Sequence, residues 1–134
     1  MIISKTPLRI SFLGGGTDLP TFYEHSNYGA VVSSSINQYL YVTIKKQNNL
    51  FEKYRLNYST TELVRDIDKI KNPIIRECIR FMNVEDYLYI STIADAPSET
   101  GLGSSSAFCV GLLNALYKFK RLSVSMEKLA EEAS

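Results

Sequence analysis

Residues 87–120 read YLYISTIADAPSETGLGSSSAFCVGLLNALYKFK and contain a predicted strand, a loop and a predicted helix in that order. Tyr87–Ala94 is rich in β-branched and aromatic residues, which favours a strand. Ser104–Lys120 is the most apolar helical segment of the chain, and the loop before it contains Gly101 and Gly103. A strand that leads through a glycine-rich loop into a helix indicates a protein that mixes both kinds of secondary structure, of the α/β or α+β class.

The rest of the chain supplies further strands and helices. Leu40, Val42 and Ile44 occupy every second position of one segment. Tyr39, Tyr41, Thr43 and Lys45 lie between and beside them, and this alternation is the pattern of a half-buried strand. Strands are expected at Leu8–Leu13, Ala30–Ile36, Tyr39–Lys46, Tyr54–Tyr58 and Tyr87–Ala94, with the second and third paired through a turn at Asn37-Gln38. Helices are expected at Thr60–Ile70, Pro73–Met82 and Ser104–Lys120, and from Met126 onward.

Capping residues predict three of the helix starts. Ser59 and Glu62 have the spacing of a capping box. Asn72 and Pro73 form a favourable pair of N-cap and first helical residue, and Ser125 is an N-cap for the last segment. That last segment lacks a glycine, a proline or a basic turn to end it. The chain is therefore expected to be a fragment that stops inside an amphipathic helix.

In that last helix the apolar residues Met126, Leu129, Ala130 and Ala133 have the spacing of a buried helical stripe.

The amino-acid composition of the whole chain limits the class of protein. The 134 residues are 45% hydrophobic and 22% charged, as expected for one soluble domain. Fifteen Lys and Arg against fourteen Asp and Glu give a net charge of +1, which argues against a nucleic-acid-binding protein.

Membrane insertion and secretion are not expected. No apolar run approaches the roughly 20 residues that span a bilayer, and the first residues lack the pattern of a secretion signal. The two cysteines, Cys78 and Cys109, are too few for a disulfide framework. These observations predict a cytoplasmic protein.

The segment from Ala96 to Ala107 carries the strongest chemical signal. Glycines adopt positive φ and let the backbone approach a ligand closely. The N–H groups and the dipole at a helix start favour an anion, and serine hydroxyls bind phosphate oxygens or Mg²⁺. The alternative is that these residues only cap the helix. No lysine follows the glycines, so the loop is not a P-loop, and three serines break the dinucleotide GxGxxG spacing.

A second glycine run follows the first predicted strand. Gly14–Gly16 either leave room for a ligand or make a tight turn. Asp18, after Thr17, either accepts hydrogen bonds from two sugar hydroxyls or caps the segment that follows. Arg9 lies inside the apolar strand, where a buried guanidinium requires a partner such as an anionic ligand and an exposed one does not.

Together the two motifs resemble the GHMP kinases, which include galactokinase, homoserine kinase, mevalonate kinase and phosphomevalonate kinase. The resemblance rests on P-x-R-I with G-x-T-D near the start and on P-x-x-x-G-L-G-S-S-S-A later, and it extends from Lys5 to Ala133. It is strongest for the bacterial D-glycero-D-manno-heptose 7-phosphate kinases. It implies an α+β fold of the ribosomal-S5-domain-2-like type, with a mixed sheet backed by helices. Residues 1–134 would form an incomplete N-terminal ATP-binding domain.

The resemblance also implies a reaction and a set of site residues. The reaction would be ATP- and Mg²⁺-dependent phosphorylation of the anomeric hydroxyl of a heptose 7-phosphate, with no nucleic-acid or membrane partner. The motif positions assign the triphosphate to Pro97, Gly101, Leu102, Gly103, Ser104, Ser105 and Ser106, and Mg²⁺ to Ser105. They assign the sugar to Asp18, Gly15, Gly16 and Thr17, and the transferred phosphoryl group to Arg9.

The chain departs from the family pattern at two places. Glu99 stands where relatives usually have glycine, and Gly15 and Gly16 replace the acid and histidine of galactokinases, which argues against galactose. An acidic Mg²⁺ ligand, a catalytic aspartate and a C-terminal domain are expected beyond Ser134. The alternatives are a fucokinase-like or isoprenoid-alcohol kinase, and a non-catalytic sensor of the same fold that binds sugar or nucleotide.

Overall fold

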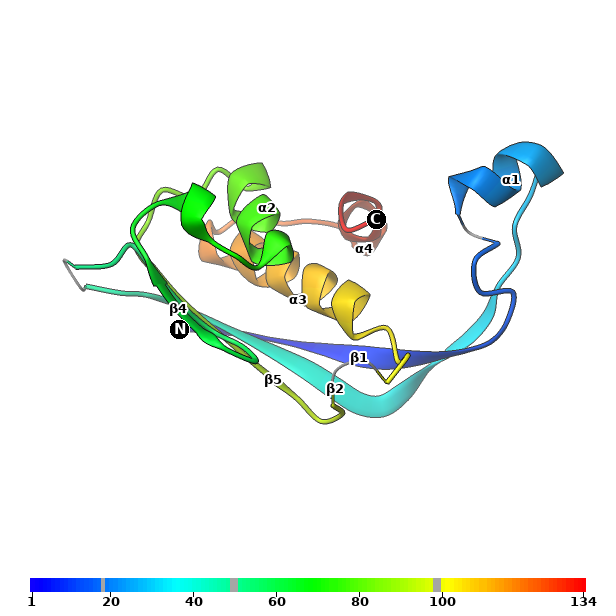
Figure 1. The fold of residues 1–134 in the computed structure, drawn as a ribbon, viewed down its shortest axis with the longest axis horizontal. Helices are drawn as coiled ribbons and strands as arrows, with labels where there is room; N and C mark the ends of the chain where they lie inside the picture. Colours follow the sequence, from blue (N-terminus) through cyan, green and yellow to red (C-terminus); the bar gives the residue numbers. More distant parts are fainter. Residues whose placement is uncertain (18, 49–50, 98–99) are drawn as a thin grey trace.

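The computed structural model describes residues 1–17, 19–48, 51–97 and 100–134 (Figure 1). These residues form a five-stranded sheet in the order β1-β2-β5-β3-β4. The strands are β1 (Ile2–Leu13), β2 (Val32–Lys46), β3 (Tyr54–Asn57), β4 (Thr61–Val64) and β5 (Leu88–Ala94). The helices are α1 (Pro20–Ser26), the 3-10 turn η1 (Ile67–Lys69), α2 (Pro73–Phe81), α3 (Ser104–Phe119) and α4 (Met126–Glu132). None of these helices is both long enough and apolar enough to cross a membrane.

The sheet is mixed, and helices cover one of its faces (Figure 1). β1 and β2 are antiparallel, as are β2 and β5, while β3 runs parallel to β5. The core lies between the sheet and helices α2 and α3, and its fully buried side chains include Val42, Ile44, Leu56, Ile90, Leu112 and Leu116. The predicted α+β class with a mixed sheet backed by helices is therefore confirmed.

A glycine brings α3 close to the sheet. A Cβ atom added at Gly111 would lie 2.6 Å from Thr6 Oγ1 and 3.5 Å from Val42 Cγ2. The first distance is too short for any real side chain, so a larger residue would push the helix away from β1. The small residue at the middle of α3 thus fixes how closely this helix packs on β1 and β2.

The expected hairpin of two strands joined by Asn37-Gln38 is wrong, because β2 is one continuous strand. On one side it pairs with β1, where Pro7 lies opposite Tyr39 and Arg9 lies opposite Ser35. Between these pairs β2 has three residues where β1 has only Leu8. Such an excess of residues makes a bulge in a paired strand, and it needs no reversal of the chain.

The helix expected at Thr60–Ile70 is also wrong, because β4 and the η1 turn occupy these residues. The buried Glu62 carboxylate accepts hydrogen bonds from the Tyr58 hydroxyl, from Lys71 N at 2.8 Å and from Asn72 N at 3.2 Å. The acidic side chain therefore holds two neighbouring turns of the chain and does not cap a helix.

The other two predicted helix starts are confirmed. Asn72 Oδ1 accepts a hydrogen bond from Ile75 N at 3.0 Å, at the start of α2. Ser125 Oγ accepts one from Lys128 N at 3.2 Å, at the start of α4. In α4, however, Met126 and Ala130 are exposed, so the buried stripe is narrower than its spacing predicts.

The end of β1 and the start of β2 extend past the other helices as an arm that carries α1 (Figure 1). We use "arm" for residues 11–17 and 19–34. Large apolar side chains of the arm are exposed, namely Phe12, Leu13, Leu19, Phe22, Tyr23, Tyr28, Val31 and Val32. The arm therefore contributes little to the core that holds the sheet and α3 together.

Candidate functional site

The start of α3 has the geometry of an anion-binding helix end. Gly103 is the N-cap with φ 70°, and Gly101 has φ 72°. Ser104–Ser106 form the first turn, whose amides have no acceptor within the helix. The helix dipole adds positive potential at the same end. The backbone therefore offers several donors to one negatively charged group.

Arg9 connects the edge strand β1 to this loop. Its backbone N–H donates to the carbonyl oxygen of Leu102 at 3.1 Å. A Cβ added at Gly103 would lie 3.2 Å from both Cζ and Nη1 of Arg9, so the guanidinium packs directly against the Gly103 backbone. Arg9 is exposed as a residue. An exposed cation thus lies beside the positive end of α3, and an anion bound there would be close to both.

A cavity of about 370 Å³ adjoins the first turn of α3. Its walls come from β2, the turn between β3 and β4, the start of α2, the end of β5 and the start of α3. The lining residues are Leu40, Tyr58, Ser59, Asn72, Ile74, Thr92, Ala94, Ala96, Ser104, Ser105 and Phe108. We call this cavity the loop groove. Six of these residues are apolar or aromatic and five are serine, threonine or asparagine, so the lining could contact both the apolar and the polar parts of a small organic ligand.

The side chain of Glu62 holds one wall of the loop groove. Burial opposes its ionisation, but hydrogen bonds from Lys71 N–H, the Tyr58 hydroxyl and Asn72 N–H outweigh burial and lower the pKa of Glu62. Burial and then the Glu62 carboxylate raise the pKa of Tyr58. At neutral pH an ionised carboxylate therefore accepts a hydrogen bond from a neutral phenol, which fixes Tyr58 at the groove.

The first glycine run forms a closed turn at the base of the arm. Thr17 Oγ1 lies 2.8 Å from the Gly14 carbonyl oxygen and 3.0 Å from that of Ala30, and it accepts a hydrogen bond from Ala30 N at 3.0 Å. A Cβ at Gly14 would lie 1.9 Å from the Ala30 oxygen, whereas one at Gly15 or Gly16 would meet nothing within 4 Å. The Thr17 hydroxyl therefore joins the two strands of the arm.

The structure brings some of the predicted site residues together and leaves others apart. Arg9 and Gly103 are in contact, and Pro97 O accepts a hydrogen bond from the Thr100 hydroxyl at 3.1 Å. Among the described residues, no hydrogen bond joins Gly14, Gly15 or Thr17 to the loop before α3, although the arm rises on the side of the sheet that α3 covers (Figure 1). Asp18 and Glu99 lie outside the described residues.

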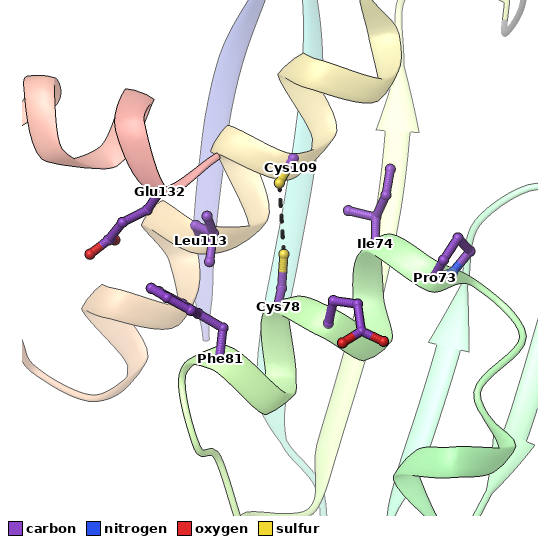
Figure 2. A pocket seen from close by; sticks show the side chains of 8 residues that line it. Pro73, Ile74, Cys78, Phe81, Cys109, Leu113 and Glu132 are labelled. Atoms are coloured by element: carbon purple, nitrogen blue, oxygen red, sulfur yellow. Dashed lines mark hydrogen bonds between the residues drawn. The ribbon is translucent and has the colours of Figure 1, made fainter. Parts of the chain in front are cut away.

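A second cavity, of about 380 Å³, lies among α2, α3 and α4 (Figure 2). It contains the free cysteines Cys78 and Cys109, whose Sγ atoms are 3.9 Å apart. Burial, followed by the neighbouring Cys109, raises the pKa of the Cys78 thiol. Glu77 and Glu132 are the charged residues of this lining, and their carboxylates would repel a phosphate. Nowhere in the described ranges do three metal-ligating side chains cluster.

The walls of the loop groove were not predicted from the sequence. Tyr58 and Ser59 belong to the segment that the capping-box pattern assigned to the start of a helix, and Thr92 and Ala94 belong to a strand with no distinguishing motif. The Asn72-Pro73 pair was a usable signal, because an N-cap places a short polar side chain at the start of α2.

Comparison with known proteins finds a match to one protein family. Residues 70–134 match the family described as the GHMP kinases N terminal domain, and this range contains α2, β5, the loop and α3. The predicted resemblance to the GHMP kinases is confirmed. The matched region includes the start of α3, whose free amides favour an anion.

Individual GHMP kinases match nearly the whole chain. The D-glycero-alpha-D-manno-heptose 7-phosphate kinase of Campylobacter jejuni is 28% identical over 98% of this chain and 42% of its own length. A crystal structure of a D-glycero-D-manno-heptose 1-phosphate kinase from Bacteroides thetaiotaomicron has a TM-score of 0.80 and 25% identity over 99% of this chain and 46% of that one. The chain therefore spans less than half the length of these relatives.

The fold is also similar to that of solved mevalonate kinases. The mevalonate kinase of Methanococcus jannaschii has a TM-score of 0.72 with 19% identity, over 98% of this chain and 44% of that one. At this identity the likeness concerns the fold alone. The chain thus has the fold of proteins named as kinases of heptose phosphates and of mevalonate.

Proposed function

We propose that residues 1–134 are the N-terminal ATP-binding domain of a GHMP-type kinase that phosphorylates the anomeric hydroxyl of D-glycero-D-manno-heptose 7-phosphate. The contact between Arg9 and Gly103 carries the proposal, because it places a cation beside an anion-accepting helix end. The similarity to a heptose 7-phosphate kinase over 98% of the chain supports the choice of substrate. The missing catalytic groups would lie in the remainder of the natural protein.

The triphosphate of ATP would bind at Gly101–Ser106, with Pro97 and Leu102 shaping the loop. A Cβ at Gly101 would meet nothing within 4 Å, so the backbone there is open to a ligand. Ser105 is exposed and lines the loop groove, which suits its hydroxyl to ligate Mg²⁺. Bound Mg²⁺ would neutralise charge on the phosphates. The base and ribose would occupy the loop groove beside Tyr58.

Arg9 and the sugar-binding residues would position the reacting groups. Phosphoryl transfer depends mainly on alignment and on neutralisation of charge. Arg9 would stabilise negative charge on the transferred phosphoryl group from its place beside Gly103. Asp18 would accept hydrogen bonds from sugar hydroxyls, with Gly15, Gly16 and Thr17 forming the adjacent turn; for Asp18 this role rests on the sequence motif.

The first experiment measures Mg·ATP affinity and heptose 7-phosphate turnover in the full-length protein. Arg9→Gln should lower turnover about 100-fold, the effect of removing one donor that stabilises transition-state charge. Ser105→Ala should weaken Mg·ATP binding. The matched control is Arg121→Gln, because Arg121 is exposed just past the opposite end of α3. Wild-type turnover in Arg9→Gln, or wild-type Mg·ATP binding in Ser105→Ala, would contradict the assignment.

The second experiment tests the acceptor. ATP consumption is compared with heptose 7-phosphate, fucose and mevalonate, and Asp18→Ala is expected to raise the KM for the sugar without changing Mg·ATP affinity. Preference for fucose or mevalonate would contradict the heptose assignment while leaving the kinase in place. Binding of both ATP and sugar without turnover by the full-length protein would instead favour a sensor.

A further inference from the structure

The described helices leave one face of the sheet uncovered (Figure 1). Successive residues of a strand point to opposite faces, so every second residue of β2 and β5 lies on this open face. Near one end of the sheet, Lys45 of β2 lies opposite Tyr89 of β5, and Tyr89 lies beside Arg55 of β3. Three neighbouring strands thus place a lysine, a tyrosine and an arginine in one row. We call this set the Lys–Tyr–Arg row.

The tyrosine in this row orients the arginine. The Arg55 guanidinium carbon lies 5.6 Å from the centre of the Tyr89 ring, within the range of a cation–π interaction. Asn57 Nδ2 donates to the Tyr89 hydroxyl at 2.9 Å, which holds the ring in place. A guanidinium that rests against a ring keeps its edge N–H groups available, and these form paired hydrogen bonds with an oxyanion.

A surface hollow of about 500 Å³ lies over the row, and none of the described residues that line it carries a carboxylate. Lys45, Lys46, Gln47, Asn48, Arg55 and Tyr89 form this lining. Lys46 pairs with Asp86, with its Nζ 2.6 Å from the carboxylate oxygen. Within the described ranges, Lys45 and Arg55 have no salt-bridge partner. Two uncompensated cations and an aromatic hydroxyl therefore surround a space larger than an inorganic phosphate needs.

We propose that the Lys–Tyr–Arg row is a second anion-binding site, which takes a phosphate group, either free or carried by a small metabolite. The site differs from the proposed ATP site in both face and end of the sheet. Tyr89 lies near the start of β5 and Ala94, which lines the loop groove, at its end, about 17 Å away along the strand. A ligand bound at the Lys–Tyr–Arg row would therefore not occupy the proposed ATP site.

The test is a titration of the full-length protein followed by amide resonances in ¹H–¹⁵N NMR spectra. One arm uses inorganic phosphate and the other ribose 5-phosphate, both at constant ionic strength. Resonances of Lys45, Arg55 and Tyr89 should shift with one dissociation constant, whether or not those of Ser104–Ser106 respond. Tenfold tighter binding of ribose 5-phosphate would assign the site to a phosphorylated metabolite, and equal binding would assign it to free phosphate.

Two variants separate the site from general electrostatic attraction. Arg55→Gln should weaken binding at the row at least tenfold. The control is Lys53→Gln, because Lys53 also lies near a tyrosine ring, 5.5 Å from that of Tyr54, but does not line the hollow. Absence of shifts at the row in both arms, or equal weakening by the two variants, would overturn the proposal.

Discussion

The two glycine loops of this chain use the same residue type for opposite purposes. At Gly14, a Cβ would lie 1.9 Å from the Ala30 carbonyl oxygen, so the glycine is required by the chain itself. At Gly101, which has nearly the same φ, a Cβ would meet nothing within 4 Å. The first loop is therefore closed by internal packing, and the second is left open at the place where α3 begins.

The polar side chains of the two loops differ in the same way. The Thr17 hydroxyl is engaged by the backbones of Gly14 and Ala30. Ser105 is exposed and lines the loop groove. The surroundings of a glycine-rich motif therefore indicate its role. A loop whose polar groups are hydrogen-bonded within the chain is a structural turn, and a loop whose donors are exposed is a candidate ligand site.

The largest effect on stability is expected for Gly14→Ala. The added methyl group meets a backbone oxygen, and the residue has a φ of 80°, so the variant combines steric overlap with backbone strain. We expect a loss of about 2–4 kcal/mol in the free energy of unfolding, measured by urea denaturation. Gly15→Ala is the matched control, since its Cβ meets nothing and its φ is not positive. Equal stability of the two variants would show that the first loop is as open as the second.

Glu62→Gln tests a third turn that is closed by internal hydrogen bonds. The free energy of unfolding should fall by about 1–3 kcal/mol at pH 7, because the carboxylate accepts hydrogen bonds from Tyr58, Lys71 and Asn72. The folded-state pKa of Glu62 lies below its ordinary 4.5. Its contribution is thus complete above that value and is lost as the pH falls through the folded-state pKa.

The measurement for Glu62→Gln is therefore urea denaturation as a function of pH. The difference between wild type and variant should shrink as the pH falls below about 4.5. The exposed Glu131→Gln is the control and should change little at any pH. A pH-independent difference would mean that the carboxylate is not ionised in the folded protein.

The pair Gly103→Ala and Gly101→Ala sharpens the comparison within the open loop. Both residues have positive φ, so each alanine should lower the free energy of unfolding, measured by urea denaturation, by about 1–2 kcal/mol. Only the alanine at 103 meets the Arg9 guanidinium, at 3.2 Å, and must displace it. Turnover of the full-length protein should therefore fall further for Gly103→Ala. A larger loss for Gly101→Ala would argue against a role for Arg9.

The smallest effects on stability are expected for hydroxyl removal. Thr17→Val keeps the shape of the side chain but removes its hydrogen bonds to Gly14 and Ala30, which should cost about 1 kcal/mol. Ser105→Ala should change the unfolding free energy by less than about 0.5 kcal/mol, because the residue is exposed. Thermal denaturation of the two variants side by side measures this difference. A larger loss of stability for Ser105→Ala than for Thr17→Val would contradict the description of the first loop as closed and the second as open.

Local sequence signals predicted those elements whose determinants are close together in the chain. Asn72 lies three positions from its partner Ile75, so α2 was predictable from a capping rule. Glu62 also has a capping spacing, but its partners include Lys71 and Asn72, nine and ten positions later. Local periodicity contains no information about such contacts, and this is why a strand was mistaken for a helix.

The candidate site shows the same division. The glycine-serine loop before α3 was found because its residues are consecutive. The contact of Arg9 with Gly103 and the walls of the loop groove depend on how β1, β3 and α2 meet α3. The motif resemblance proposed Arg9 and the loop as parts of one site, but only the fold supplies their distance.

The close packing of Gly111 against Thr6 has a mechanical consequence for that distance. Gly111 lies eight residues after Gly103 on one rigid helix, about 12 Å along its axis. Any side chain added at Gly111 would act as a wedge between α3 and β1, the strand that carries Arg9. The helix would then tilt or shift as a rigid unit, and the distance between Gly103 at its start and Arg9 on β1 would change. Loss of alignment between Arg9 and a bound phosphate could thus arise from a residue that touches neither.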